Sequence, residues 1–300
     1  MDLGFGIWDL GFDLIVTRFA PSPTGYLHLG HVVNAIYVWG VARARGGRVL
    51  LRIEDHDRIR SRAEFETAIL DDLDWLGFVP DEGRDALIRQ SDRNDAYAAA
   101  LQRLRAAHHV YVCTCSRTEI HRRARSVGGH VDAERYDGSC RDRRLDEGPG
   151  RGLRLLIPDA PERFTDLRLG PVEQTAAQQC GDLLLRDRDD HWTYQFAVTV
   201  DDFRQGVTLV IRGEDLLSST GRQITLARML GRERPPAFLH HPLIVKASGE
   251  KLSKAAGDTG VRELRARGES APDVIGRAAA AVGLIDRPRP IEAAEVASLF

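Results

Sequence analysis

Two histidines and a glycine stand close together near the start of the chain, in the stretch LHLGH. His28, Gly30 and His31 follow a short apolar run, where we expect a strand to give way to a helix. Backbone N–H groups and the helix dipole favour an anion at such a point, and an imidazole adds a donor for a phosphoryl oxygen. A helix cap or a core position would suit the same side chains, so these residues alone leave both roles open.

The lysines form a second candidate site. The chain contains 39 arginines but only three lysines, and Lys246, Lys251 and Lys254 all lie in KASGEKLSK. A compact ammonium on a flexible stem is not interchangeable with a planar guanidinium, and ammonium groups after a glycine turn suit a loop that closes over a polyphosphate. A solvated surface hairpin is the alternative, but the histidine motif elsewhere in the chain favours phosphate chemistry.

Three of the four cysteines, Cys113, Cys115 and Cys140, form a third group. In a chain without a secretory signal, such spacing favours a metal site over disulfides. The stretch 117–154 contains ten arginines, seven acids and few apolar residues, so it cannot build a core unaided and would gain stability from a bound metal. We expect one structural zinc.

The residue types alone do not identify the fourth ligand of that zinc. Structural zinc takes four ligands in a tetrahedron, and His121 or His130 would complete the set. Free buried thiols are the alternative to a metal. Cys180 stands apart and reads as a small core residue.

Alternating strands and helices must position these groups. The apolar spacing predicts strands at 14–20 and 48–55, and helices from His28 to Gly46, at 63–76 and at 94–107. Short strands are expected in 151–158 and 182–187. A strand at 207–217, a helix at 218–230, a strand beginning at His241 and helical structure at 261–285 follow. This rhythm predicts an α/β fold with a doubly wound parallel sheet. In such a sheet ligands bind where strand C-termini meet helix N-termini.

The composition is that of an ordinary globular protein, with 43% hydrophobic and 29% charged residues and a net charge of −2. It excludes a globally basic nucleic-acid binder but allows a local basic patch. No apolar run reaches the ~18 residues of a membrane helix. The apolar N-terminal stretch lacks a basic region and carries Asp2, Asp9 and Asp13, so we expect no signal peptide and a cytoplasmic monomer without membrane contact.

Several motifs together resemble a known family. PSPTGYLHLGH is similar to the HIGH signature and KLSKA to the KMSKS signature of class I aminoacyl-tRNA synthetases. RFAPSPTG, LLRIED and VIRGEDLLSSTGRQITLARMLG resemble the glutamyl subgroup, in the expected order over residues 15–260. His31 departs from many relatives, which have a small residue there, and the loop ends KLSKA rather than KMSKS but keeps both lysines.

The resemblance implies a Rossmann-like catalytic domain, ATP and Mg²⁺, and a set of site residues. It implies glutamate-binding residues at Arg18, Phe19, Ala20, Pro21, Ser22, Glu54, Tyr194 and Arg212. It implies ATP-binding residues at His28, Gly30, His31, Lys251 and Lys254, of which the histidines and lysines are catalytic. It implies zinc ligands at Cys113, Cys115, Tyr136 and Cys140.

Length then favours one branch of the subgroup. The chain ends soon after the lysine motif, and it resembles the glutamyl-Q tRNA(Asp) synthetases, truncated paralogues that consist of the catalytic half. We expect an N-terminal extension at 1–13, the two halves of the catalytic domain at 14–109 and 191–260, an inserted zinc-bearing, RNA-contacting α+β subdomain at 110–190, a C-terminal helical segment at 261–300, and no anticodon-binding domain.

That resemblance implies a reaction and an RNA partner. Glutamate would be activated by ATP without RNA, and the glutamyl group would pass to queuosine in the anticodon arm of tRNA(Asp). A discriminating glutamyl-tRNA synthetase that charges a tRNA 3′ end, an HxGH nucleotidyltransferase and a non-catalytic RNA-binding paralogue are the alternatives. The nucleotidyltransferase would not need RIED, RGEDL and KLSK together, and a non-catalytic paralogue would be expected to lack His28 or Lys254.

Overall fold

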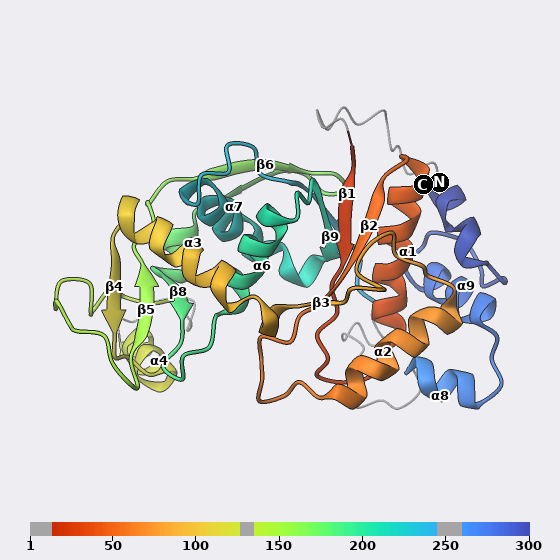
Figure 1. The fold of residues 1–300 in the computed structure, drawn as a ribbon. Helices are drawn as coiled ribbons and strands as arrows, with labels where there is room; N and C mark the ends of the chain where they lie inside the picture. The colour runs from red at the N-terminus through yellow and green to blue at the C-terminus, as the bar shows by residue number, and fades with distance from the viewer. Residues whose placement is uncertain (1–13, 127–134, 245–259) are drawn as a thin grey trace. The chain divides into compact units, whose positions relative to one another are not determined.

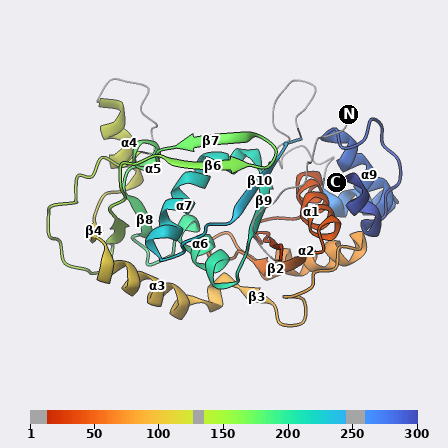
Figure 2. The ribbon, with the colours of Figure 1, turned by 90° about the horizontal axis from the view of Figure 1, so that it is seen from above.

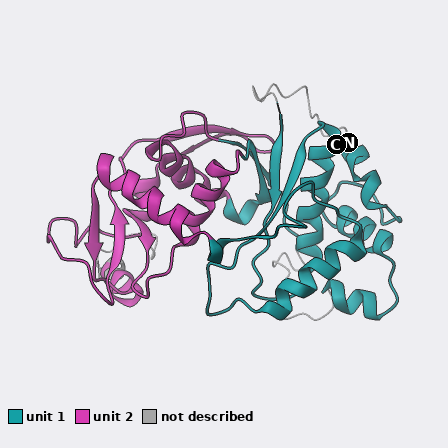
Figure 3. Cartoon of the chain, in the orientation of Figure 1, with its two compact units in different colours: residues 1–92, 207–216, 236–300 teal, residues 93–206, 217–235 magenta. Residues whose placement is uncertain are grey.

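A computed structural model of the chain describes residues 14–126, 135–244 and 260–300. These residues form two compact units, shown in Figure 3. Unit 1 comprises residues 1–92, 207–216 and 236–300, and unit 2 comprises residues 93–206 and 217–235. The expected subdomain borders at 110 and 190 both fall inside unit 2, because helices on either side of the insertion pack with it.

Unit 1 is built on parallel strands (Figure 1). β1 (Val16–Phe19) pairs with β2 (Arg48–Ile53), and β2 pairs with β3 (Ile88–Arg89), all in parallel. β9 (Leu209–Gly213) pairs in parallel with β10 (Ala237–His241). The Thr208 N–H donates to the Val16 carbonyl at 2.8 Å, which joins β9 to β1. The predicted parallel α/β architecture is therefore confirmed.

Helices cover this sheet because each strand is followed by a segment with helical apolar spacing. α1 (Leu29–Ala44) packs on β1, β2 and β9, and α9 (Ala271–Ala281) and the 3₁₀ helix η3 (Ala293–Leu299) pack on α1. The other helices of the unit are α2 (Ala63–Leu76), α8 (Val261–Ala266) and the short η1 (Gln90–Asp92). Val32, Ile36 and Val38 of α1 are fully buried. None of the helices in the described part of the chain is long and apolar enough to cross a membrane.

Unit 2 is a mixed α+β body. β4 (Val110–Cys113), β5 (Gly152–Leu155) and β8 (Leu183–Arg186) form an antiparallel sheet. β6 (Glu162–Asp166) and β7 (Gly170–Gln174) form a hairpin, visible in Figure 2. The helices are α3 (Asn94–Ala107), α4 (Arg117–Ser126), α5 (Ala176–Cys180), α6 (Tyr194–Arg204) and α7 (Thr220–Met229), with η2 (Glu214–Ser219) leading into α7.

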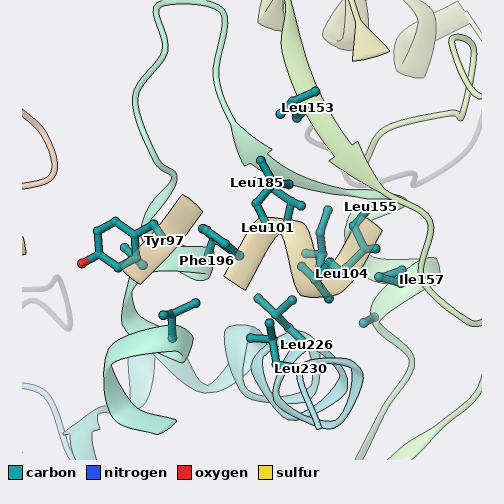
Figure 4. Close-up of a cluster of buried hydrophobic side chains, with 14 of the residues drawn as sticks. Tyr97, Leu101, Leu104, Leu153, Leu155, Ile157, Leu185, Phe196, Leu226 and Leu230 are labelled. Atoms are coloured by element: carbon teal, nitrogen blue, oxygen red, sulfur yellow. The ribbon is translucent and has the colours of Figure 1, made fainter. Parts of the chain in front are cut away.

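The core of unit 2 joins its helices to its antiparallel sheet. α3 contributes Leu101 and Leu104, β5 contributes Leu153 and Leu155, and α6 contributes Phe196, all nearly inaccessible to solvent (Figure 4). Burial of such side chains contributes about 1.5–3 kcal/mol each to folding. The core explains why α3 and α6 belong to unit 2 although the sequence places them outside the expected insertion.

The predicted elements agree with the structure at most positions, including helices at 63–76 and 94–107. One prediction was wrong. The strand expected to begin at His241 instead ends there as β10, because Pro242 has no N–H to donate to a ladder. The helical structure expected at 261–285 is confirmed and consists of two helices, α8 and α9, because Gly268 takes a left-handed conformation and Ser270 begins a new cap.

Candidate active site and cysteine cluster

His28 and His31 form a reciprocal cap at the start of α1. The Gly30 N–H donates to His28 Nδ1 at 3.1 Å, and the His28 N–H donates to His31 Nδ1 at 3.1 Å. The two ring centroids are 4.0 Å apart. This is a capping box in which imidazoles take the place of the usual hydroxyl and carboxylate. The capping role left open by the sequence is real.

The cap also decides which nitrogen carries the proton in each ring. Because Nδ1 accepts a backbone N–H in both His28 and His31, the neutral imidazoles carry their proton on Nε2. Each ring therefore presents an N–H donor at a helix N-terminus, where an anion is already favoured. Capping and phosphate binding are thus compatible uses of the same two side chains.

Gly30 allows the His28 ring to lie over the helix. A Cβ at position 30 would be 2.9 Å from Cε1 of His28, which is too close for two carbon atoms. Any larger residue at this position would displace the ring and the donor that it carries.

The first turn of α1 is tied to the carboxyl end of β9. Arg18 of β1 and Asn34 of α1 both donate to the Ile211 carbonyl, at 3.2 and 3.4 Å. The Asn34 amide also lies 3.1 Å from His241 Nε2, while His241 Nδ1 lies 2.9 Å from the Pro242 carbonyl. Arg18 and His241 are at most 5% exposed. This network fixes Arg18 at the edge where the parallel strands end.

Glu54 lies directly after β2 at the same edge. Its backbone N–H donates to the Pro21 carbonyl at 3.0 Å, which brings the segment after β1 beside it. Glu54 Oε1 accepts from Arg52 at 2.8 Å, and both side chains are buried. Its second oxygen, Oε2, has no partner among the residues that the structure describes. A buried carboxylate with one open oxygen suits a cationic ligand.

Arg212 is held in β9 by a buried histidine. Its Nε donates to His240 Nε2 at 3.0 Å, and its guanidinium lies over the Phe238 ring at 5.4 Å. Arg212 is 4% exposed and His240 is fully buried. A guanidinium held at the carboxyl edge of parallel strands is a group that can bind an anionic ligand.

The remaining residues expected to bind glutamate occupy different positions. The Phe19 ring lies in the core against Trp39, at 5.3 Å between centroids, so its side chain is structural. Ala20, Pro21 and Ser22 follow β1 at the strand edge. Tyr194 is the first residue of α6 in unit 2, where it is half-buried.

Lys246, Lys251 and Lys254 lie outside the described residues. The chain becomes described again at Gly260, which forms a β-bridge with His28, and the Val261 N–H donates to the Leu27 carbonyl at 2.9 Å. Lys254 precedes Gly260 by six residues, a span that reaches at most ~20 Å. The chain that follows the lysine motif is thus attached directly to the histidine cap.

The predicted cysteines come together in unit 2. The Sγ atoms of Cys113, Cys115 and Cys140 lie within 4.8 Å of one another, with Cys115 and Cys140 at 3.5 Å. The Tyr136 hydroxyl is 3.5 Å from Cys113 Sγ and accepts the Cys140 N–H at 2.8 Å. His121 is not part of this cluster, and His130 lies outside the described residues.

Arginines surround the thiols. Arg123 donates to Cys115 at 3.1 Å, Arg154 donates to Cys113 at 3.3 Å, and the Arg154 guanidinium stacks on the Tyr136 ring at 3.8 Å. Such cations favour the thiolate form, which is the form that binds metals.

The thiols respond differently to this environment. Burial raises the pKa of Cys113 above its usual value, although Tyr136 and Arg154 oppose the change. Burial also opposes ionisation of Cys140, but hydrogen bonds from Thr114, Tyr136 and Cys115 outweigh it and lower the pKa of Cys140 to about 6.

The donor set fits a structural zinc ion. Sulfurs bound tetrahedrally at about 2.3 Å from zinc lie roughly 3.8 Å apart, close to the 3.5 Å between Cys115 and Cys140. Tyr136 is the oxygen donor beside them. Buried thiols with arginine donors match the outer contacts that thiolate ligands need.

Sequence reasoning missed the residues that hold the site in place. Arg52 stands in the quoted LLRIED motif but was given no role, and Asn34, His240 and His241 belong to no quoted motif, yet these residues hold Arg18, Glu54 and Arg212 in place. The one signal was the pair of adjacent histidines in FLHH at a strand end, next to the apolar run.

Comparisons with known proteins agree with this geometry. Residues 14–277 match the family described as tRNA synthetases class I (E and Q), catalytic domain. The chain is 41% identical over 300 residues to the glutamyl-Q tRNA(Asp) synthetase of Symbiobacterium thermophilum, covering 96% of this chain and 92% of that protein. It is 46% identical over 241 residues to the protein of the same name from Geobacter sulfurreducens, covering 80% of this chain and 75% of that protein.

A solved structure shows the same fold. The crystal structure of a glutamate tRNA ligase from Elizabethkingia meningosepticum in complex with its amino acid is similar to this chain, with a TM-score of 0.80 and 28% identity. The match covers 96% of this chain and 65% of the ligase, so the chain spans about two thirds of that protein's length. The chain belongs to the class I tRNA synthetases of the E and Q type, and residues 14–277 form their catalytic domain.

Proposed function

We propose that the protein activates glutamate with ATP and transfers the glutamyl group to queuosine in the anticodon arm of tRNA(Asp). The observation that carries this proposal is the alignment with relatives named glutamyl-Q tRNA(Asp) synthetase at 41–46% identity. The same chain covers only 57% of a Cereibacter sphaeroides protein named glutamate–tRNA ligase 2, at 41% identity.

In the first step an α-carboxylate oxygen of glutamate attacks the α-phosphorus of ATP, and the bond to pyrophosphate breaks. The products are glutamyl-adenylate and pyrophosphate. No covalent bond to the protein is needed, because positioning and charge neutralisation supply the catalysis. Mg²⁺ accompanies ATP as its counter-ion.

The residues of unit 1 support this step. The Nε2–H groups of His28 and His31 donate to the α-phosphate as its charge grows. The open oxygen of Glu54 takes the substrate ammonium, and Arg18 and Arg212 take carboxylates. Lys251 and Lys254 neutralise the departing pyrophosphate, and the attachment of Gly260 beside His28 supports this placement. Tyr194 adds a hydroxyl to the glutamate site.

In the second step a hydroxyl of the queuosine cyclopentenediol attacks the glutamyl carbonyl, and AMP leaves. This diol imitates the terminal ribose diol of an ordinary tRNA acceptor, so one adenylate chemistry serves both. The RNA-contacting surface would lie on unit 2, whose arginine-rich stretch 117–154 supplies phosphate contacts. One structural zinc, held by Cys113, Cys115, Cys140 and Tyr136, stabilises that stretch when bound.

The competing function is that of a glutamate–tRNA ligase, which charges a 3′ end. The similarity to the Elizabethkingia ligase and to the Cereibacter protein favours it as the second candidate. Both candidates share the glutamate activation step and differ only in the acceptor.

Two measurements test the proposal. The first is ATP–pyrophosphate exchange with each amino acid in turn, in the absence of RNA, and we expect exchange with glutamate only. The second offers labelled glutamate to tRNA(Asp) with queuosine, tRNA(Asp) without queuosine, and tRNA(Glu). Label on the queuosine-containing tRNA alone supports the proposal, whereas label on the 3′ end of tRNA(Glu) would replace it with the ligase.

A further inference from the structure

A hollow of about 720 Å³ lies within unit 2, a size typical of ligand sites. Its lining comes from the end of β4 and the start of α4, from β5, from the end of α5 and the start of β8, from the turn between β8 and α6, and from the first residues of α6 and α7. Cys113 and Cys115 of the cysteine cluster and Tyr194 belong to this lining.

Three arginines that line this hollow have no carboxylate partner among the described residues. Arg117 and Arg188 are exposed, and Arg188 donates to the Gly150 carbonyl at 3.0 Å. Arg222 is half-buried, and its Nε atom is buried without a hydrogen-bond partner in the part of the chain that the structure describes. Buried N–H groups of a charged side chain are almost always satisfied, so Arg222 is arranged for a ligand that accepts hydrogen bonds.

The carboxylates of the hollow are mostly engaged elsewhere. Asp182 accepts from Arg141 at 3.0 Å and from the Tyr111 hydroxyl. Asp187 accepts the backbone N–H groups of Asp189 and His191, each at 2.9 Å. Asp189 is the one lining carboxylate that is exposed and unpaired in the described part of the chain, against three guanidinium groups. The balance of charge therefore favours an anion.

A second buried polar atom in the hollow also lacks a hydrogen-bond partner within the described residues. His121 Nε2 is buried and has no hydrogen-bond partner within the described residues, and the side chain lines the same hollow next to Ile120. An imidazole beside an aliphatic side chain offers both a polar contact and a stacking surface for a base. His121 lies one helical turn after Arg117 on α4, so the imidazole and a guanidinium are neighbours in the lining and suit an anion that carries a polar ring.

We propose that the hollow binds one nucleotide of the acceptor RNA, with its phosphate on Arg222, Arg117 and Arg188 and its base at His121. The inference rests on the proposed function only in taking RNA as the acceptor. It adds a nucleotide subsite on unit 2 and assigns the Arg of the STGRQ motif to it.

The test compares the RNA affinity of the wild type with that of Arg222→Gln, by fluorescence anisotropy of labelled queuosine-containing tRNA(Asp) at several salt concentrations. We expect Kd to rise about 10-fold and the slope of log Kd against log salt to fall by about one, as for the loss of one phosphate contact. Arg228→Gln is the matched control, since Arg228 lies on the same helix, pairs with Glu162 at 3.4 Å and does not line the hollow. Thermal unfolding checks that both variants are folded.

Equal affinities of Arg222→Gln and Arg228→Gln would overturn the subsite while leaving the proposed function standing. If Arg222→Gln does not fold, the exposed positions provide the test through Arg117→Gln and Arg188→Gln. We expect each of these variants to weaken RNA binding about 3- to 10-fold. If both bind RNA like the wild type, the subsite is refuted. A parallel titration with ATP separates the sources of phosphate, because a loss of ATP affinity without a loss of RNA affinity would assign the hollow to a free nucleotide instead. A wild type that binds no tRNA would overturn both proposals.

Discussion

A single substitution separates the observed role of His28 from its proposed one. Its Nδ1 caps α1, and we propose that its Nε2–H donates to a phosphate. Asparagine is a good cap residue but has no group at the position of Nε2. We expect His28→Asn to lower glutamate-dependent ATP–pyrophosphate exchange by about 100-fold, the loss typical of one transition-state donor, with the unfolding midpoint nearly unchanged.

His28→Ala is the companion variant, because it removes the cap as well. It should lose the same activity and also about 1 kcal/mol of stability, as measured by urea unfolding. Exchange by His28→Asn at the wild-type rate would show that the imidazole is a cap and nothing more.

Glu54 is expected to decide glutamate binding rather than chemistry. Glu54→Gln keeps a hydrogen bond to Arg52 but loses the charge opposite a substrate ammonium. A charged hydrogen bond contributes about 1.5–3 kcal/mol, so KM for glutamate in the exchange assay should rise roughly 10- to 100-fold. Glu82→Gln is the control, because Glu82 forms an exposed ion pair with Arg48 at 2.7 Å. An unchanged KM in Glu54→Gln would remove Glu54 from the site.

Helix α2 contains a buried carboxylate that weakens the fold at neutral pH. Asp72 is 5% exposed, and no described residue forms a hydrogen bond to its Oδ2. Burial raises the pKa of Asp72 to about 6, with Asp71 and Glu263 adding to the effect and Arg265 and Arg262 opposing it. The folded state therefore holds this proton more tightly than the unfolded chain, and stability falls as pH rises from about 4 to about 6.

Replacing the Asp72 carboxylate by an amide should remove this loss of folding stability at neutral pH. We expect Asp72→Asn to be more stable than wild type by about 2 kcal/mol at pH 7.5 and to show little difference near pH 4. Glu64→Gln is the matched control, because Glu64 is exposed on the same helix and is not among the groups that shift the pKa of Asp72. Equal stability of Asp72→Asn and wild type at both pH values, by urea unfolding, would contradict this account of α2.

The proposal that the cysteine cluster binds zinc predicts how much metal the purified protein contains. Purified protein should contain about one zinc per chain, and the double variant Cys113→Ser, Cys115→Ser should contain none. Cys180→Ser is the control, since Cys180 lies outside the cluster and donates to the Ala176 carbonyl at 3.2 Å. Elemental analysis of each protein after gel filtration measures its zinc content. Wild-type protein that is folded and active without metal would reject a zinc site.

The proposed acceptor of the glutamyl group concerns the whole molecule and predicts a reaction that does not use the tRNA 3′ end. Under that proposal the attacking hydroxyl belongs to the anticodon arm, so removing the terminal CCA from queuosine-containing tRNA(Asp) should leave glutamyl transfer unchanged. The measurement is acid-precipitable labelled glutamate, with intact tRNA(Asp) as the reference. Complete loss of labelling after CCA removal would indicate a ligase that charges the 3′ end.

The sequence by itself determined the parallel α/β fold and the family. Apolar spacing defines helices such as 63–76 and 94–107, because local periodicity depends only on which face of an element is buried. His28, Glu54, Arg212 and the three cysteines were identified before any coordinates, since each stands in a motif or at a strand end.

Only the tertiary structure decided how those residues are held. That His28 and His31 together cap α1 is a matter of local geometry that the residue types left open. That Asn34 contacts His241 at the end of β9 depends on side chains brought together from distant parts of the chain. The donation from Arg123 to Cys115 depends on how α4 packs after β4. The extent of unit 2 is likewise decided by packing, because α3 and α6 share its core although they flank the insertion in sequence. Periodicity specifies which face of an element is buried, but the partner of that face is selected by long-range contacts.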